Sequence, residues 1–180
     1  MNEQFYKSVA NSTAHRPIRD LLSGQVTDNP SLLADLLQIA FDTNDRNHHK
    51  ACWVLELIME SHIKWLAPHL AAFCSTLASY RHEGALRSVS KIALFAIKKH
   101  HKEKFLTALQ IEQLTESCFD WLIDPHGKVA TKAYAMRALF LLGKKQDWIY
   151  PELQRILSED SIKHSAGYKA AAKDILRRII

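Results

Sequence analysis

One pattern occurs four times at a single helical phase: a basic residue, a small residue directly after it, and a leucine six positions beyond the small one. The copies are Lys50-Ala51…Leu57, Arg87-Ser88…Leu94, Lys132-Ala133…Leu139 and Lys169-Ala170…Leu176. Successive copies begin 37, 45 and 37 residues apart. A period of roughly 40 residues is typical of stacked helix pairs. The pattern therefore predicts a repeated helical architecture.

A second register supports the repeat. Trp65-Leu66-Ala67-Pro68-His69-Leu70 recurs as Trp148-Ile149-Tyr150-Pro151-Glu152-Leu153. The two prolines precede Arg87 and Lys169 by nearly the same distance. Since proline is tolerated only in the first turn of a helix, both segments should open helices.

Length and composition favour one all-α domain over residues 1–180. The chain can hold about four helical repeats, and its 47% hydrophobic content is too high for a disordered chain. Five glycines and five prolines supply few of the turns that an all-β fold needs. The start lacks a signal-peptide pattern, and no apolar run reaches membrane-spanning length, so we expect a cytoplasmic protein without a membrane partner.

The expected helices form a short cap followed by four pairs. The cap, residues 1–28, should contain helices over 3–13 and 17–23, the second ended by Gly24. A stop is also expected at Gly143. The pairs should cover residues 30–178, as 31–41 with 48–61, 63–79 with 83–100, 111–123 with 128–142, and 148–158 with 162–178.

The longer spacing between the second and third copies places eight extra residues within 98–110. This segment begins with Lys98 and Lys99 and should extend a helix or form a longer loop. Long connections often carry function. The alternative is a solvated helix end whose basic residues are favoured by the helix dipole.

Over residues 30–178, paired helices with proline in the first and a basic residue opening the second resemble a HEAT- or armadillo-type α-solenoid. The resemblance implies an α-α superhelix. The usual HEAT pattern places Asp before Val-Arg or Val-Lys, whereas the residue before the basic one here is His49, Leu86, Thr131 or Tyr168. An acidic or hydroxyl residue stands eight places before each basic one and could cap the turn: Asp42, Ser79, Asp124 and Ser161.

The chain, including Cys118-Phe119-Asp120-Trp121-Leu122 and the segment 147–153, is also similar to short bacterial helical-repeat proteins that are sometimes labelled adenylosuccinate lyase. Members of that lyase superfamily resemble one another in a Ser-Ser-x-x-Met-Pro-x-Lys loop. This motif does not occur in the sequence. We therefore expect no lyase activity.

The basic residues of the repeat are the first candidate binding site. Stacked repeats would align them into a ridge that binds phosphates or an acidic peptide. The alternative is that each stem lies along apolar surface while its head pairs with a carboxylate or a helix-end carbonyl. The candidates are Lys50, Arg87, Lys91, Lys132, Lys169 and Lys173, with Lys98 and Lys99 in the longer connection.

Tryptophans and cysteines are expected in the core. Trp65 and Trp148 occupy equivalent repeat positions, which favours packing between helices over stacking on nucleic-acid bases; the same holds for the other two tryptophans, Trp53 and Trp121. Three unpaired cysteines within apolar stretches should be reduced core thiols, namely Cys52, Cys74 and Cys118.

Motifs for metal, cofactor or catalysis are missing from the sequence. His48 and Cys52 could share a helix face, but no further ligand follows at a zinc-site spacing, so we expect no metal. Glu56 and Glu60 have a spacing that is common on solvated helix faces. Neither a nucleophile elbow nor a glycine-rich phosphate loop is present, and we expect no cofactor.

These observations predict a non-catalytic binding or scaffolding module that engages a protein partner through one face, formed by the second helices of the pairs. The alternative is a nucleic-acid-binding protein, similar to solenoid DNA-repair glycosylases, that uses a basic face. The net charge of +5 permits an acidic partner. Partner identity and oligomeric state stay open.

Overall fold

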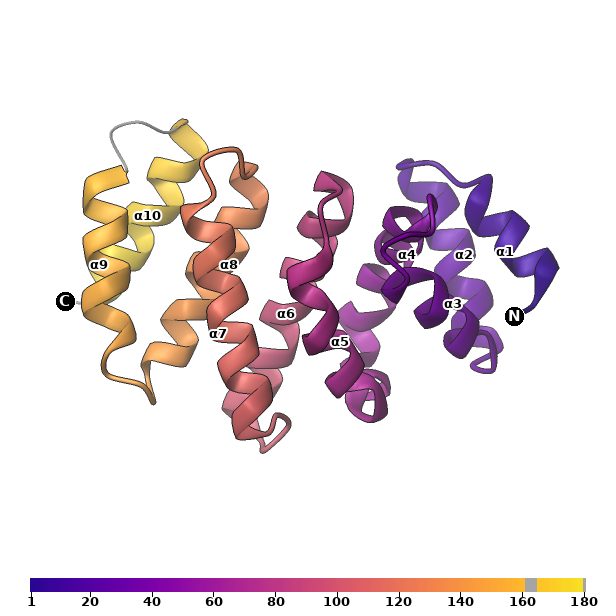
Figure 1. Cartoon of the computed structure of the whole chain (residues 1–180), viewed down its shortest axis with the longest axis horizontal. Helices are drawn as coiled ribbons and strands as arrows, with labels where there is room; N and C mark the ends of the chain where they lie inside the picture. Colours follow the sequence, from indigo (N-terminus) through magenta and orange to yellow (C-terminus); the bar gives the residue numbers. More distant parts are fainter. Residues whose placement is uncertain (161–164, 180) are drawn as a thin grey trace. The chain divides into compact units, whose positions relative to one another are not determined.

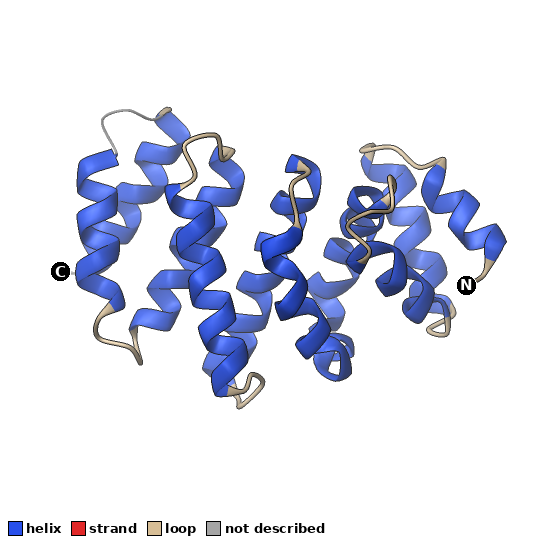
Figure 2. Ribbon diagram, viewed as in Figure 1, coloured by secondary structure: helices blue, strands red, loops and turns tan. Residues whose placement is uncertain are grey.

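A computed structural model describes residues 1–160 and 165–179, and all of their secondary structure is helical (Figures 1 and 2). The chain divides into two compact units, residues 1–92 and 93–180. Each unit has its own buried core. The expectation of one domain over 1–180 stays a prediction.

Unit 1 is built around α4 (His48–His62), which packs against α2 (Arg16–Asp28) and α3 (Leu32–Phe41). The cap helix α1 (Glu3–Ala10) contacts α3 and α4. Apolar side chains at helical spacing on these elements fill the core. Its fully buried members include Leu36, Val54, Leu55, Ile58, Met59, Leu66 and Phe73.

The predicted end of the second cap helix at Gly24 is wrong. Helix α2 continues through Gly24 to Asp28. Val26 lies in this extension and is fully buried. Burying a valine side chain stabilises the fold by about 1.5–3 kcal/mol, whereas glycine inside a helix costs only about 1 kcal/mol.

The single helix predicted over residues 63–79 is also wrong. The chain instead forms a 3₁₀ helix η1 (Ile63–His69), the short helix α5 (Leu70–Thr76) and a second 3₁₀ turn η2 (Leu77–Ser79). Pro68 lies inside η1. Because proline has no N–H to donate and crowds the preceding turn, the regular α-helix starts only after it.

The eight extra residues lengthen one helix and form a tied connection. Helix α6 (Glu83–Lys102) runs two residues past its predicted end. His100 Nδ1 then accepts hydrogen bonds from the backbone N–H groups of Phe105 and Leu106, at 3.2 and 3.0 Å. Thr107 and Gln110 form a reciprocal capping box that starts the next helix.

Unit 2 contains α7 (Ala108–Ile123), α8 (Val129–Gly143), α9 (Ile149–Asp160) and α10 (Ala166–Ile179). Helix α8 contacts the other three, and α7 and α9 lie on the near side of the unit in Figure 1. The predicted stop at Gly143 is confirmed. The predicted start at residue 162 and the cap Ser161 lie outside the described residues. The core includes Leu114, Cys118, Leu122, Met136, Leu139, Leu153 and Leu157.

Two of the predicted turn caps act alike. Asp42 and Asp124 stand directly after α3 and α7. Each carboxylate accepts a backbone N–H two residues on, from Asn44 at 3.1 Å and from His126 at 2.9 Å. This side-chain turn ends the first helix of a pair and redirects the chain.

Among the described helices, none combines the length and the apolar character needed to cross a membrane.

Candidate functional site

Two of the repeated basic residues bind the ends of helices. Lys50 Nζ donates to the carbonyl of Ala10, the last residue of α1. Lys132 Nζ donates to the carbonyl of Leu122, near the end of α7, at 2.8 Å. Lys132 itself is only 1% exposed. A cation at a helix C-terminus is stabilised by the helix dipole. Lys132 is therefore too buried to touch a partner.

Arg87 and Lys91 lie against Glu56, a buried carboxylate of unit 1. Glu56 is 2% exposed and accepts from Ser88 Oγ at 2.6 Å, Lys91 Nζ at 3.0 Å and Arg87 Nη1 at 3.3 Å. The expectation of Glu56 on a solvated face is wrong, because two cations and a hydroxyl compensate its burial. Glu60 is half exposed and lies 3.4 Å from Lys91.

The other basic candidates lie at the surface of unit 2. Lys98, Lys169 and Lys173 are exposed, whereas Lys99 pairs with Glu103 at 2.7 Å. The eight candidates thus fall into buried, paired and exposed groups rather than one uniform ridge. Their role in binding a partner stays a prediction.

Three histidine rings meet in unit 1. His49 stacks on His82 with ring centroids 3.9 Å apart, and His48 lies 5.7 Å from His49 and 5.9 Å from His82. Burial lowers the pKa of His49 to about 4, and His82, His48 and Lys50 act in the same direction. The pKa of His82 is also lowered by burial. The lowered pKa values favour neutral rings at His49 and His82.

The described residues hold no group of three or more His, Cys, Asp or Glu side chains placed to bind a metal ion.

The prediction of core thiols is confirmed, since Cys52, Cys74 and Cys118 are all buried and none of them forms a disulfide. Burial raises the pKa of the Cys52 and Cys74 thiols to about 12. Such thiols are poor nucleophiles.

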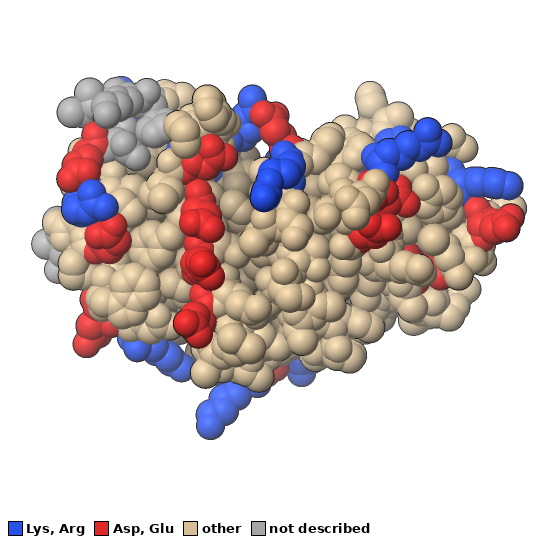
Figure 3. Space-filling view, viewed as in Figure 1, with Lys and Arg blue, Asp and Glu red and all other residues tan. Residues whose placement is uncertain are grey.

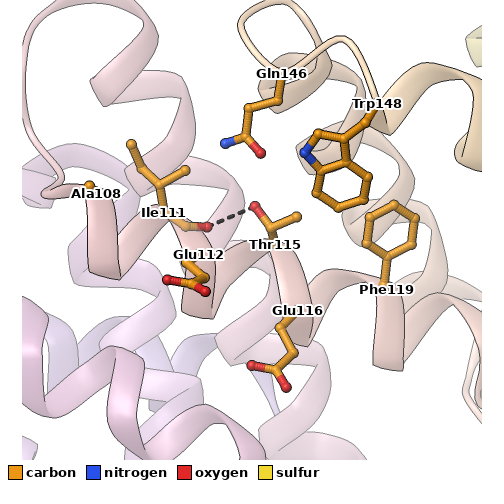
Figure 4. A pocket seen from close by; sticks show the side chains of 8 residues that line it. All are labelled: Ala108, Ile111, Glu112, Thr115, Glu116, Phe119, Gln146 and Trp148. Atoms are coloured by element: carbon orange, nitrogen blue, oxygen red, sulfur yellow. Dashed lines mark hydrogen bonds between the residues drawn. The ribbon is translucent and has the colours of Figure 1, made fainter.

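An open, largely apolar groove lies in unit 2 between α7 and the start of α9. It consists of two hollows of about 670 Å³ each, with Phe119 and Trp148 bordering both. The two rings stack at a centroid distance of 5.6 Å (Figure 4). The first hollow is also lined by Ala108, Ile111, Glu112, Thr115, Glu116 and Gln146, and the second by Ile123, Pro151, Glu152, Arg155 and Ile156.

The position of Trp148 corrects the prediction that it packs in the core. Its residue is 57% exposed. Ile149 opens α9 and is fully buried, so its neighbour Trp148 turns outward and lies on Phe119 instead. Trp121 is buried as expected, while Trp53 and Trp65 are half-buried.

The α7 contribution to the groove was missed from the sequence, although a signal exists. Ile111, Thr115, Phe119 and Ile123 follow one another at steps of four, which places them on one stripe of a helix. The stripe ends with Ile123, which is 54% exposed. Steps of four predict a shared face, but they do not reveal which face stays uncovered.

The groove has the chemistry of a binding surface. Among the described residues that line it there is no Ser, Cys or His, and the one hydroxyl among them, Thr115 Oγ1, donates to the Ile111 carbonyl at 2.7 Å. In Figure 4 the Glu112 and Glu116 carboxylates point away from the two aromatic rings. The rings and Ile123 therefore offer apolar contact area without an activated nucleophile.

A family model described as a HEAT repeat domain matches residues 5–179. No curated protein and no solved structure matched the chain.

Proposed function

Because the chain belongs to the HEAT repeat family, we propose that it is a non-catalytic binding module that holds a protein partner in the groove between α7 and α9. Its fold is the all-α solenoid of that family. Helical repeats leave long surfaces free for contact with other molecules. The proposed surface belongs to the first helices of the pairs, whereas the sequence pointed to the second helices.

The observation that carries the proposal is that the exposed Trp148 ring stacks on the ring of Phe119. Large apolar side chains that share an exposed patch mark sites of interaction more often than isolated ones. Tryptophan is also enriched among the residues that dominate binding energy at protein interfaces. The stacked ring holds Trp148 in place, so little conformational entropy is lost on binding.

A peptide-display selection on the immobilised full-length chain tests this function. Selected peptides are then measured against the wild type and the Trp148→Ala variant. We expect the variant to weaken their binding by about thirtyfold, the effect of losing a central aromatic anchor.

The matched control is Leu109→Ala. Leu109 lies on α7, is 64% exposed and does not line either hollow. This variant should change affinity by less than about threefold. A selection that yields no binding peptide, or peptides that bind Trp148→Ala as tightly as the wild type, would refute the proposed groove.

A second candidate function, binding of a polyanion such as nucleic acid, is favoured by one row of cations. Lys169, Lys173 and Arg177 stand at steps of four on α10 and are all exposed. They form no ion pair with a described residue. The nearby Arg178 differs from these three, because it pairs with Asp174 at 3.5 Å.

Retention on heparin and on duplex DNA tests this candidate. Replacing Lys169, Lys173 and Arg177 by alanine should lower the slope of log affinity against log salt by up to about three. Absence of retention at low salt would exclude a polyanion partner.

A further inference from the structure

A row of acidic side chains follows the apolar stripe of α7. Glu112, Glu116, Asp120 and Asp124 each lie one position after a stripe residue, and the first three are exposed. Figure 3 shows this row as a column of acidic side chains along α7. Among the described residues, no Lys or Arg pairs with it. At 1.5 Å per residue the row is about 18 Å long.

The α9 side of the groove carries charges of both signs. Glu152 and Glu159 lie on α9 with Arg155, while Asp147 stands beside Trp148 in the connection that also carries the exposed Lys144 and Lys145. Arg155 is already held by two of these carboxylates: its Nε lies 3.1 Å from Glu152 Oε2 and its Nη1 lies 3.0 Å from Glu159 Oε2. The charges on this side largely compensate one another, so the uncompensated negative charge beside the apolar floor is that of the α7 row.

We propose that the occupant of this groove is a cationic amphipathic α-helix of a protein partner. This inference rests on the proposed function and adds the chemistry of the partner. Apolar residues at positions i, i+3, i+4 and i+7 of such a helix would contact Phe119, Trp148 and Ile123. Lys or Arg on its flanks would face the α7 row, because complementary charge selects the partner and speeds association.

A helix suits the groove better than an extended strand. The backbone groups of α7 and α9 are used within their own helices, so the groove offers no free row of donors and acceptors. A strand laid on it would leave its N–H and C=O groups without partners, at a cost in free energy. A helix satisfies these groups internally. An anionic lipid surface is disfavoured, since the acidic row would repel it.

Three synthetic peptides of about 16 residues, long enough to span the row, test the inference. The first carries an apolar helical stripe flanked by Lys. The second has the same stripe flanked by Glu, and the third has the composition of the first in an order that breaks the stripe. The affinity of each peptide for the full-length chain is measured by titration calorimetry. We expect the first peptide to bind at least about tenfold more tightly than the other two. Its affinity should fall as the salt concentration rises.

The double variant Glu116→Lys/Asp120→Lys tests the acidic row itself. It should weaken binding of the cationic peptide roughly tenfold, because two attractive pairs become repulsive. The control Glu3→Lys/Asp28→Lys makes the same charge change at exposed positions of unit 1 and should leave the affinity unchanged. Circular dichroism verifies that each variant is folded.

Each alternative outcome overturns the inference in a distinct way. If the Glu-flanked peptide binds as tightly and needs Trp148, the cationic partner is wrong while the proposed function stands. If display-selected peptides bind at Trp148 and all three designed peptides fail, a helical cationic occupant is excluded. Binding to vesicles of phosphatidylcholine and phosphatidylserine without peptide binding would make the surface a membrane contact. If neither designed nor selected peptides bind, both proposals fail.

Discussion

At the scale of residues, the repeated cation serves the fold at several positions. Lys50 and Lys132 each donate to a carbonyl at the end of a helix, and Arg87 lies against buried Glu56. The sequence could predict that these cations border the core, since each lies in line with a leucine. It could not predict which atom accepts from each cation, because the acceptors are the carbonyl of Ala10 in the cap, the carboxylate of Glu56 in the preceding pair, and the carbonyl of Leu122 in the partner helix of the same pair.

Lys132 should contribute to stability and Lys169 should not. Replacing Lys132 by Met keeps the stem but leaves the buried Leu122 carbonyl without its 2.8 Å donor, which should cost about 1–3 kcal/mol. Lys169→Met at the equivalent exposed position should change the free energy of unfolding by less than about 0.5 kcal/mol. Urea unfolding measures both, and equal effects would contradict this assignment.

The histidine cluster should make the protein less stable in mild acid. The pKa of His49 is about 4 in the folded chain and about 6.5 when unfolded, so the unfolded chain binds more protons between these values. The free energy of unfolding is therefore highest above about pH 6.5 and falls as the pH drops towards about 4. His82, whose pKa is also lowered, acts in the same direction.

Urea midpoints at about pH 7 and about pH 5 measure this loss. His49→Gln should reduce the difference between them, with a remainder from His82. His126→Gln, at an exposed turn position of unit 2, is the control. An unchanged pH dependence in His49→Gln would show that His49 does not contribute.

At the scale of elements, helical periodicity predicted most helices but not their breaks. The single helix predicted over residues 63–79 does not form, because Pro68 makes the first part of this segment a 3₁₀ helix. The second cap helix continues past Gly24 because Val26, which is buried, lies beyond it. At Gly24, burial against other helices outweighs local propensity, whereas at Pro68 a local effect breaks a segment whose apolar periodicity is helical. The uncovered stripe of α7 could not be predicted, because it depends on where Trp148 and α9 lie.

Two glycines should respond oppositely to alanine. A Cβ at Gly24 would meet nothing within 4 Å, so Gly24→Ala in α2 should stabilise unit 1 by about 0.5–1 kcal/mol. A Cβ at Gly143 would overlap the ring of Tyr150, whose hydroxyl donates to the Phe140 carbonyl. Gly143→Ala should therefore destabilise the protein by about 1–3 kcal/mol. Thermal unfolding of both variants checks the two signs, and a stabilising Gly143→Ala would contradict the packing described.

At the scale of the whole molecule, the two units carry different surfaces. In unit 1, exposed and half-exposed cations lie beside buried or half-exposed carboxylates, as Arg87 and Lys91 do with Glu56 and Glu60. In unit 2, the acidic row of α7, which pairs with no Lys or Arg among the described residues, borders an apolar groove, while exposed cations lie on other elements, among them α10. The net charge of +5 conceals this separation. An overall charge therefore does not identify the charge of a partner.

The most direct test of the central claim is ¹⁹F NMR of the full-length chain labelled with 5-fluorotryptophan. The four tryptophans give four resonances, which single Trp→Phe variants assign. On titration with a display-selected peptide, binding at the groove predicts that the resonance of Trp148 shifts while those of Trp53 and Trp65 in unit 1 stay in place. A Trp148 resonance that does not move at saturating peptide, or a shift confined to Trp53 or Trp65, would contradict the assignment of the groove as the binding site.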